Sequence, residues 1–295
     1  MESLNRIGRY VKAVTLTALG RNPAGRALTV FPGDIFLVSY FRSGSTWSRF
    51  LVGNLTQQDE PVTFANVERL VPLITVLPDR ILRKSPRILK SHECFDPRYP
   101  RVVYIVRDPR DVAVSFYFYN LKVRVIHDGY PMDDFVSRFV AANVVDYADR
   151  VGCWQDHVLS WVRLRAGKPG FRLVRYEDLL ADPAKELTNL APFLGIEATP
   201  ERIERAVRLS SGSHMQSLEK EQSRQWVTTK GTRDDIPFVR AAKSGGWRNK
   251  LSDAAVRTIE EAWGETMKEL GYELATDLES RAIRPTVSNV AGCSD

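Results

Sequence analysis

The chain has 295 residues, of which 43% are hydrophobic and 26% are charged, and its formal net charge is +6. This composition is typical of a globular protein with a large core. The basic residues are spread along the sequence rather than packed in runs. That distribution excludes a nucleic acid as the expected partner and favours a small polyanionic ligand.

The three cysteines, Cys94, Cys153 and Cys293, are odd in number and lack paired or metal-ligand spacing. We therefore expect a cytoplasmic protein with reduced thiols and no structural zinc. No stretch approaches the ~18 to 20 apolar residues that a membrane span needs, so stable membrane insertion is not expected. Residues 11–20 are mildly apolar and predict a surface helix rather than a signal peptide, with an amphipathic membrane contact as the alternative.

The first strong pattern along the chain is the apolar run Ile35–Ser39, followed by a glycine-centred turn and an amphipathic helix over residues 46–55. A strand, a small-residue loop and a helix N-terminus form an anion cradle, because unpaired N–H groups and the positive end of the helix dipole meet there. A turn that binds nothing is the alternative. The candidate ligands are Arg42, Ser43, Gly44, Ser45 and Thr46.

A second strand is predicted over residues 87–90, and His92 follows it at the carboxyl edge. Lys90 lies two residues earlier, on the same side of the pleat. We expect His92 to face the cleft as a candidate general base, with a structural histidine as the alternative. The remaining histidines are expected in loops or on helix surfaces: His127, His157 and His214.

A third strand, residues 102–106, leads into a helix over residues 110–119, which an aspartate N-cap and a proline introduce. Arg107 follows this strand at the edge where open α/β sheets bind ligands, and Ser115 lies on a buried face of the helix. The two side chains are therefore candidates for a second anion site. The alternative pairs Arg107 with Asp111 and bonds Ser115 to its own helix.

The rest of the chain predicts a fourth strand at Phe171–Arg175 and further helices at residues 132–145, 154–165, 184–194, 200–209 and 252–270. Strands that alternate with helices indicate an α/β fold with a central, mostly parallel sheet flanked by helices. We expect one domain over residues 1–275, with a core of about 33–270, and a flexible tail over 276–295. Residues 221–246 lack periodicity and predict a long functional loop.

Four segments, in this order, resemble the sulfotransferases that use 3′-phosphoadenosine 5′-phosphosulfate (PAPS), especially the cytosolic type. Residues 40–47 resemble the family's 5′-phosphosulfate loop, Tyr-Pro-Lys-Ser-Gly-Thr-Thr-Trp, and residues 90–92 resemble its Lys-Thr-His segment. Residues 107–115 resemble the family's 3′-phosphate segment almost residue for residue. Residues 175–178 resemble the segment whose tyrosine approaches the adenine. The resemblance spans most of the chain, about residues 35–249.

The resemblance implies a P-loop-like nucleotide-binding core and transfer of the sulfuryl group from PAPS, as co-substrate, to a hydroxyl or, less often, an amine of a small acceptor. It implies no metal. His92 would be the general base, and Lys90 and Arg42 would neutralise charge on the transferred group. The donor-binding residues implied are Arg42, Ser43, Gly44, Ser45, Thr46, Trp47, Arg107, Ser115, Tyr176 and Arg240.

Several departures from the family pattern bear on the donor site. Arg42 replaces the usual loop lysine. The family's Arg-Lys-Gly-x-x-Gly-Asp-Trp-Lys segment appears as residues 240–248, where the lysine, the first glycine and the aspartate are lost and Lys243 is the candidate replacement. The aromatic residue with which the family sandwiches the adenine is missing from this sequence, which has Gly212 near that place. The family's dimerisation motif is not recognisable, which leaves the oligomeric state open.

Two other functions remain open from the sequence: a catalytically weak nucleotide-binding relative and a P-loop kinase-like phosphotransferase. The second needs G-x-x-x-x-G-K-[S/T], which residues 42–47 do not contain. Specificity for an apolar acceptor is expected from residues 62–82, 117–131 and 221–239. The alternative for residues 62–82 is that their apolar side chains only cap the core.

Overall fold

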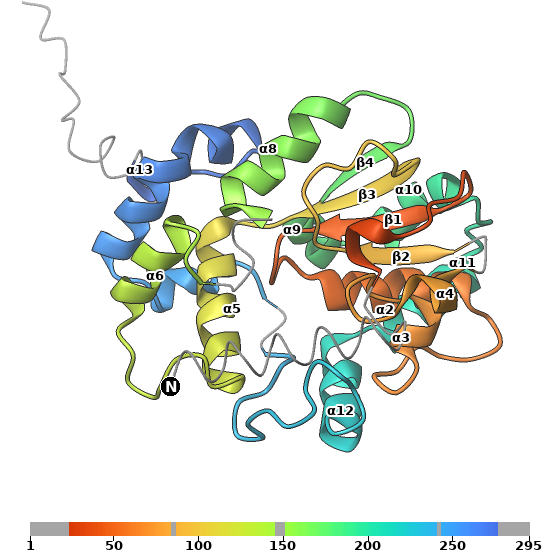
Figure 1. The fold of residues 1–295 in the computed structure, drawn as a ribbon, viewed down its shortest axis with the longest axis horizontal. Coiled ribbons are helices and arrows are strands. Elements are labelled where there is room, and N and C mark those ends of the chain that lie inside the picture. Colours follow the sequence, from red (N-terminus) through yellow and green to blue (C-terminus); the bar gives the residue numbers. More distant parts are fainter. Residues whose placement is uncertain (1–23, 84–86, 145–150, 241–242, 277–295) are drawn as a thin grey trace, which may run out of the picture.

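A computed structural model describes residues 24–83, 87–144, 151–240 and 243–276. Its centre is a four-stranded parallel sheet in the order β2-β1-β3-β4, and Figure 1 shows helices on both sides of it. The strands are β1 (Ile35–Ser39), β2 (Ile88–Ser91), β3 (Arg101–Val106) and β4 (Phe171–Arg175). The predicted parallel α/β sheet is confirmed, and each strand begins and ends within one residue of its predicted position.

The two central strands, β1 and β3, are buried on both faces because helices cover both sides of the sheet. Leu37 of β1 lies between Lys90 of β2 and Val103 of β3. This register aligns the carboxyl ends of the three strands. The loops that leave those ends therefore meet at one edge of the sheet, where open α/β folds bind ligands.

Alternate side chains of the strands enter different cores, as the two-residue period of a strand requires. Leu37 and Val103 pack on the face covered by three helices. Phe36 and Val38 pack on the opposite face, which four helices cover. The first group is α2 (Ser45–Thr56), α10 (Pro183–Leu194) and α11 (Pro200–Leu209); the second is α5 (Pro109–Lys122), α6 (Met132–Val140), α8 (Trp154–Arg165) and α13 (Asp253–Glu269).

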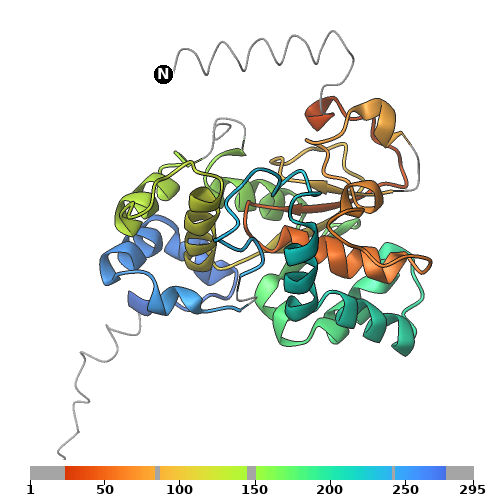
Figure 2. The ribbon, with the colours of Figure 1, turned by 90° about the horizontal axis from the view of Figure 1, so that it is seen from below.

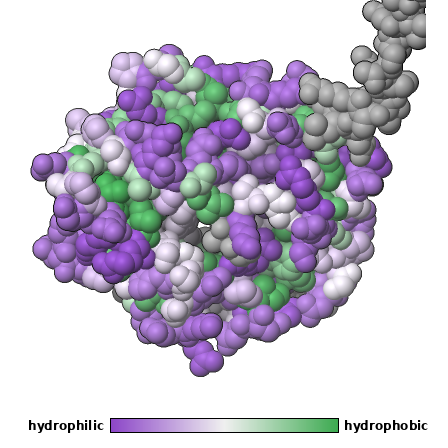
Figure 3. All heavy atoms as spheres, turned by 180° about the vertical axis from the view of Figure 1, so that it is seen from behind, coloured by the Kyte–Doolittle hydropathy of each residue, from purple (hydrophilic) through white to green (hydrophobic). Residues whose placement is uncertain are grey.

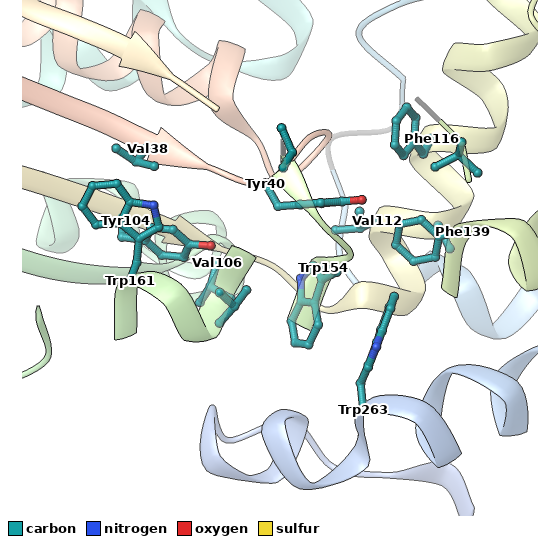
Figure 4. Packing of buried hydrophobic residues seen from close by; sticks show 14 of the residues in the cluster. Val38, Tyr40, Tyr104, Val106, Val112, Phe116, Phe139, Trp154, Trp161 and Trp263 are labelled. Atoms are coloured by element: carbon teal, nitrogen blue, oxygen red, sulfur yellow. The ribbon is translucent and has the colours of Figure 1, made fainter. Parts of the chain in front are cut away.

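Aromatic side chains fill the core on the second face, between the sheet and α13 (Figure 4). Trp154 and Trp263 lie with their ring centroids 5.5 Å apart, and Phe139 meets Trp263 edge-on at 5.3 Å. The apolar stripe of α13 was predicted to pack on the core, and the buried Trp263 confirms it.

The remaining elements are short or were not predicted. They are η1 (Gly25–Ala27), α3 (Val67–Leu70), α4 (Asp79–Leu82), α9 (Tyr176–Ala181), α12 (Gly212–Gln222) and η2 (Gly246–Asn249). The prediction that α6 extends to residue 145 was wrong, because Ala142 takes a left-handed backbone with φ 58° and the helix ends at Val140. The predicted N-terminal helix and nearly all of the predicted tail lie outside the described residues.

The surface turned away from the view of Figure 1 is mostly hydrophilic, with hydrophobic side chains in small separate groups (Figure 3). Within the described ranges, none of the helices has the length and apolarity needed to cross a bilayer.

Candidate active site

The loop after β1 forms the floor of the candidate site. Gly44 takes a left-handed backbone with φ 91° and caps α2, and Arg42 also takes a positive φ of 61°. Strained non-glycine residues of this kind persist mainly where a binding loop needs them. Ser43 is fully buried, and its Oγ has no hydrogen-bond partner within the described part of the chain. A buried hydroxyl without a partner indicates a place for a polar ligand.

Two aromatic residues lie against this loop. A Cβ built on Gly44 would come within 2.4 Å of the Tyr176 ring, so only glycine allows the ring to approach so closely. The Trp47 ring meets Tyr176 edge-on at 5.5 Å, and the Trp47 indole N–H donates to the Ser210 carbonyl at 2.8 Å. The structure therefore brings Gly44, Trp47 and Tyr176 together, as predicted.

Three arginines converge above the loop. Arg42 Nε donates to Ser115 Oγ at 3.2 Å, and Arg107 Nη1 donates to the Arg42 carbonyl at 3.3 Å. The Arg107 guanidinium lies 4.2 Å from the centroid of the Tyr176 ring. Arg240 packs over Phe118.

No carboxylate oxygen of the described residues lies within 4 Å of a nitrogen of Arg42, Arg107 or Arg240. Burial, together with repulsion from Arg240 and Arg107, lowers the pKa of Arg42 to about 10. Burial and repulsion from Arg107 also lower the pKa of Arg240 to about 10. Buried cations without a counter-charge are unfavourable until an anion binds beside them.

The alternative interpretation of Arg107 and Ser115 is wrong. Asp111 forms no ion pair with Arg107; its carboxylate accepts the backbone N–H groups of Gly245 at 2.7 Å and Trp247 at 3.1 Å. Ser115 Oγ accepts from Arg42. Asp111 therefore fixes the turn that follows Arg240, and Arg107 and Ser115 face the site.

His92 lies at the end of β2, beside this loop. Its Nδ1 is 2.8 Å from the Ser39 carbonyl oxygen, which can only accept, so we assign the ring proton to Nδ1 and a lone pair to Nε2. Phe41 stacks on the imidazole with ring centroids 4.4 Å apart. Burial, and then the nearby charge of Lys90, lower the pKa of His92 well below 6.5. The side chain is thus a neutral imidazole at physiological pH.

Lys90 contacts His92 rather than the arginines. Its Nζ donates to the Ser91 carbonyl at 2.6 Å, lies 3.4 Å from Ser39 Oγ, and approaches His92 Nδ1 at 3.1 Å. Burial lowers the pKa of the lysine well below its usual value. Because Nδ1 carries the ring proton, the contact between the two nitrogens is a close approach rather than a hydrogen bond. The charge of Lys90 disfavours a positive charge on the neighbouring His92.

The sequence prediction for His157 was wrong. This residue is fully buried rather than on the surface of α8. Its Nε2 donates to the His92 carbonyl at 3.1 Å, and its Nδ1 accepts from the Tyr104 hydroxyl at 2.8 Å. Burial lowers its pKa to about 3. The signal was present in the spacing, because Trp154, His157 and Trp161 share one helix face at positions i, i+3 and i+7.

A segment that we name the strap, residues 223–240, passes from α12 toward α5 beside the site (Figure 2). Lys122 Nζ donates to the carbonyls of Arg233 and Ile236 at 2.8 and 2.7 Å. Glu219 accepts the N–H groups of Phe238 and Val239 at 2.5 and 2.7 Å. The strap has no regular secondary structure, as predicted, yet these anchors fix it on both sides.

The apolar segment 62–82 divides between core and surface. Six of its apolar side chains are buried and cap the core, as the alternative for this segment holds: Val62, Phe64, Val67, Val71, Ile74 and Leu82. Leu73, Val76 and Leu77 are half-buried. Leu73 also forms a parallel bridge with Lys90, which brings this end of the segment to the strand that carries His92.

Comparisons with known proteins agree with this geometry. A family model described as "Sulfotransferase domain" matches residues 32–271. The chain is 28% identical over 267 residues to Sulfotransferase 1B1 of Mus musculus, covering 84% of this chain and 87% of that protein. It is 27% identical over 273 residues to Sulfotransferase 1E1 of Homo sapiens, covering 84% and 88%.

Two solved structures share the fold. Mouse sulfotransferase SULT7A1 complexed with PAP has a TM-score of 0.64 and 24% identity, covering 86% of this chain and 90% of that chain. Retinol dehydratase in complex with androsterone and the inactive cofactor PAP also has a TM-score of 0.64, with 20% identity and 86% of each chain covered.

Proposed function

The chain belongs to the sulfotransferase family, and on that premise we propose that it transfers the sulfuryl group of PAPS to a hydroxyl group of a small apolar acceptor, with His92 as the general base. One observation carries the proposal. Three arginines that form no ion pair within the described residues, the buried Arg107 and the half-buried Arg42 and Arg240, gather at the edge of the sheet where a neutral imidazole also lies. Two structural relatives were solved with PAP, the desulfated product of this donor.

The residues at the site fit a donor with two phosphates. The backbone of residues 43–46, at the N-terminus of α2, would hold the 5′-phosphate, and the unpartnered hydroxyl of Ser43 supports this assignment. Arg107, Ser115 and Arg240 would hold the 3′-phosphate; the buried Arg107 Nε also lacks a partner within the described residues.

The adenine would lie against Trp47 and Tyr176, two rings that already pack edge to face. No three side chains of His, Cys, Asp or Glu lie together as a metal-ligand set in the described part of the chain.

In the reaction, the acceptor oxygen attacks the sulfur in line as the bond from sulfur to the bridging phosphate oxygen breaks. His92 Nε2 takes the hydroxyl proton, and PAP leaves with the electron pair of the broken bond. Positioning and charge stabilisation supply most of the rate enhancement in such transfers. Ser39 fixes the tautomer that leaves Nε2 free to accept the proton, and Lys90 keeps His92 neutral before it does so.

We propose an apolar acceptor because the residues near His92 and Arg42 are apolar or aromatic. Phe41 stacks on the base, and the rings of Tyr119 and Phe238 lie against the Arg42 guanidinium. The proposal also includes a cytoplasmic enzyme, on the basis of the free Cys94 and Cys153. We further propose that residues 1–275 act as one domain, without stable membrane insertion and without a nucleic-acid partner.

A thermal-shift comparison tests the donor class. PAP should raise Tm by an amount set by its concentration relative to Kd, and ATP with Mg²⁺ should not. The reverse result would favour the kinase-like phosphotransferase. Turnover then requires labelled PAPS and a panel of phenols, sterols and aliphatic alcohols.

His92→Ala tests the base. We expect turnover to fall by ~10² to 10⁴-fold, the usual contribution of general base catalysis, while the affinity for PAP changes little. Wild-type turnover in this variant would remove His92 from the mechanism. Because burial lowers the pKa of His92, the acid limb of kcat/KM should lie below pH 6.5, since the base stays neutral until the pH falls through that pKa.

A further inference from the structure

One cation of the expected 3′-phosphate site is missing from the sequence. Position 241, where the family pattern has a lysine, is alanine, and Lys243 is the nearest candidate replacement. Lys243 is an exposed residue, and it meets the site through its backbone, whose carbonyl accepts from Arg107 Nη2 at 3.1 Å. The position of Lys243 therefore gives no support to its side chain as the replacement.

Arg42 is a further cation that lies beside the predicted 3′-phosphate residues. It belongs to the loop after β1, yet its side chain reaches α5, where Nε donates to Ser115 Oγ at 3.2 Å. Its guanidinium carbon lies 4.9 Å from the centroid of the Tyr119 ring and 4.5 Å from that of Phe238. Nη2 also contacts the Phe238 carbonyl at 3.4 Å. These contacts hold the group beside the 3′-phosphate residues.

We propose that Arg42 is a specificity residue of the 3′-phosphate half of the donor site, where it supplies the cation that Ala241 lacks. This inference rests on the proposed function, because it presumes a donor with a 3′-phosphate. Arg42 lies near both other arginines of the site, Arg107 and Arg240, as their mutual repulsion indicates. The 3′-phosphate carries nearly two negative charges, and it would offset much of the repulsion among the three cations.

The chemistry of a guanidinium suits this position. Its planar fork can donate two parallel hydrogen bonds to a phosphate, and it stacks on aromatic faces, which a lysine ammonium does less well. Contacts with Tyr119, Phe238 and Ser115 fix the plane of the group. A fixed cation suits the 3′-phosphate, which stays in place during transfer. The 5′-phosphate, from which the sulfuryl group departs, is assigned instead to the backbone of residues 43–46 at the N-terminus of α2.

The test compares three nucleotides on the full chain by titration calorimetry: PAP, adenosine 3′-phosphate and adenosine 5′-phosphate. We expect Arg42→Gln to weaken the binding of the two 3′-phosphorylated nucleotides by about tenfold or more, which is ~1.4 kcal/mol. The affinity for adenosine 5′-phosphate should change by less than about threefold. Lys243→Ala is the matched control, because it removes a neighbouring cation and should leave all three affinities within about threefold.

Other outcomes overturn the inference in distinct ways. A loss confined to adenosine 5′-phosphate and PAP would place Arg42 at the 5′-phosphate, and an equal loss for all three nucleotides would show a general role in the fold of the loop. A loss of PAP affinity in Lys243→Ala but not in Arg42→Gln would assign the cation to Lys243. If the wild-type protein bound PAP no better than adenosine 5′-phosphate, the proposed donor site itself would fail.

A second variant guards against misfolding of the loop. Arg42→Lys keeps the charge and loses the fork, so we expect a PAP affinity between those of the wild type and Arg42→Gln, with a wild-type Tm. If Arg42→Lys bound every nucleotide as the wild type does, while Arg42→Gln lost affinity for the 3′-phosphorylated nucleotides, the 3′-phosphate would require the charge of Arg42 but not its planar fork. If Arg42→Lys lost more affinity for adenosine 5′-phosphate than for adenosine 3′-phosphate, the assignment would be contradicted.

Discussion

Arg107 and Arg110 lie three residues apart, one before and one after the N-cap of α5, and both are buried, with 8% and 2% of their surface exposed. Their surroundings differ completely. Arg110 binds Asp108 at 2.7 Å and Glu260 at 2.6 Å and stacks on Trp247 at 4.0 Å. Arg107 has only carbonyl acceptors, and its Nε has no partner within the described residues.

The difference distinguishes an arginine that stabilises the fold, Arg110, from one that is available to bind a ligand, Arg107. The charges of Arg110, Asp108 and Glu260 satisfy one another, and they tie the start of α5 to α13. Arg107 has no such compensation, so its desolvated charge is unfavourable until an anion arrives. Burial alone therefore does not make an arginine a sign of a binding site. A buried arginine indicates one when no carboxylate pairs with it.

The largest effect that would test this contrast is the loss of Arg110. We expect Arg110→Ala to reduce the free energy of unfolding by ~3 to 5 kcal/mol, because it leaves two buried carboxylates unpaired. Urea denaturation followed by fluorescence measures it. Arg107→Ala is the matched control and should cost far less stability. If the two variants lost the same free energy of unfolding, the distinction between a structural Arg110 and a ligand-binding Arg107 would be wrong.

The converse effect appears in ligand binding. Arg107→Ala should weaken PAP binding by roughly 10- to 150-fold, since a hydrogen bond to a charged group contributes ~1.5 to 3 kcal/mol. Adenosine 5′-phosphate, which lacks the 3′ group, should bind nearly as well as before. Calorimetry with both nucleotides checks this, and parallel losses would remove Arg107 from the 3′ site.

A smaller effect is expected from the strap, which carries Arg240 toward the uncompensated arginines. Glu219→Gln keeps the shape of the side chain but loses one of the two carboxylate acceptors that hold Phe238 and Val239. One lost hydrogen bond of ~1 kcal/mol corresponds to about a fivefold weaker PAP affinity. Glu221→Gln changes an exposed residue of the same helix and should have no effect. If Glu219→Gln and Glu221→Gln bound PAP with the same affinity, the strap would not position Arg240.

The smallest effect is that of simple anions. Sulfate at about three times its Kd should stabilise the protein by ~0.8 kcal/mol, or a Tm rise of about 2 to 3 °C, because it offsets the unpaired charges. Chloride at the same ionic strength should give less. The rise should disappear in Arg107→Ala. A rise that persists there would reflect a general effect of salt on the surface.

Much of the fold follows from local patterns. The four strands are short apolar runs bounded by turn residues, and Asp108 caps α5 as its position before a proline predicts. The helix α12 was missed because its sequence, Gly212–Gln222, is polar and has only two buried residues, Met215 and Glu219. Its amphipathic pattern is therefore weak.

The site was predictable in its members but not in its contacts. The motifs identify Arg42, Arg107 and Ser115, but Arg42 meets Ser115 across 73 residues of sequence. The direction of a guanidinium on four rotatable bonds depends on neighbours such as Tyr119 and Phe238, which lie in other elements. His157 was misplaced for a related reason, because a buried histidine needs partners that only the folded chain supplies.

The anchors of the strap have a consequence for how this enzyme can change. Lys122, Glu219 and Gln216 all bind main-chain atoms of the strap: the carbonyls of residues 233, 236 and 240 and the N–H groups of residues 238 and 239. Any residue other than proline at positions 238 and 239 offers the same backbone groups. Apart from Phe238 and Arg240, which belong to the proposed donor site, the strap can therefore drift in sequence, or be randomised in a library, and still return to the same path. New acceptors could be explored in this way without rebuilding the donor site.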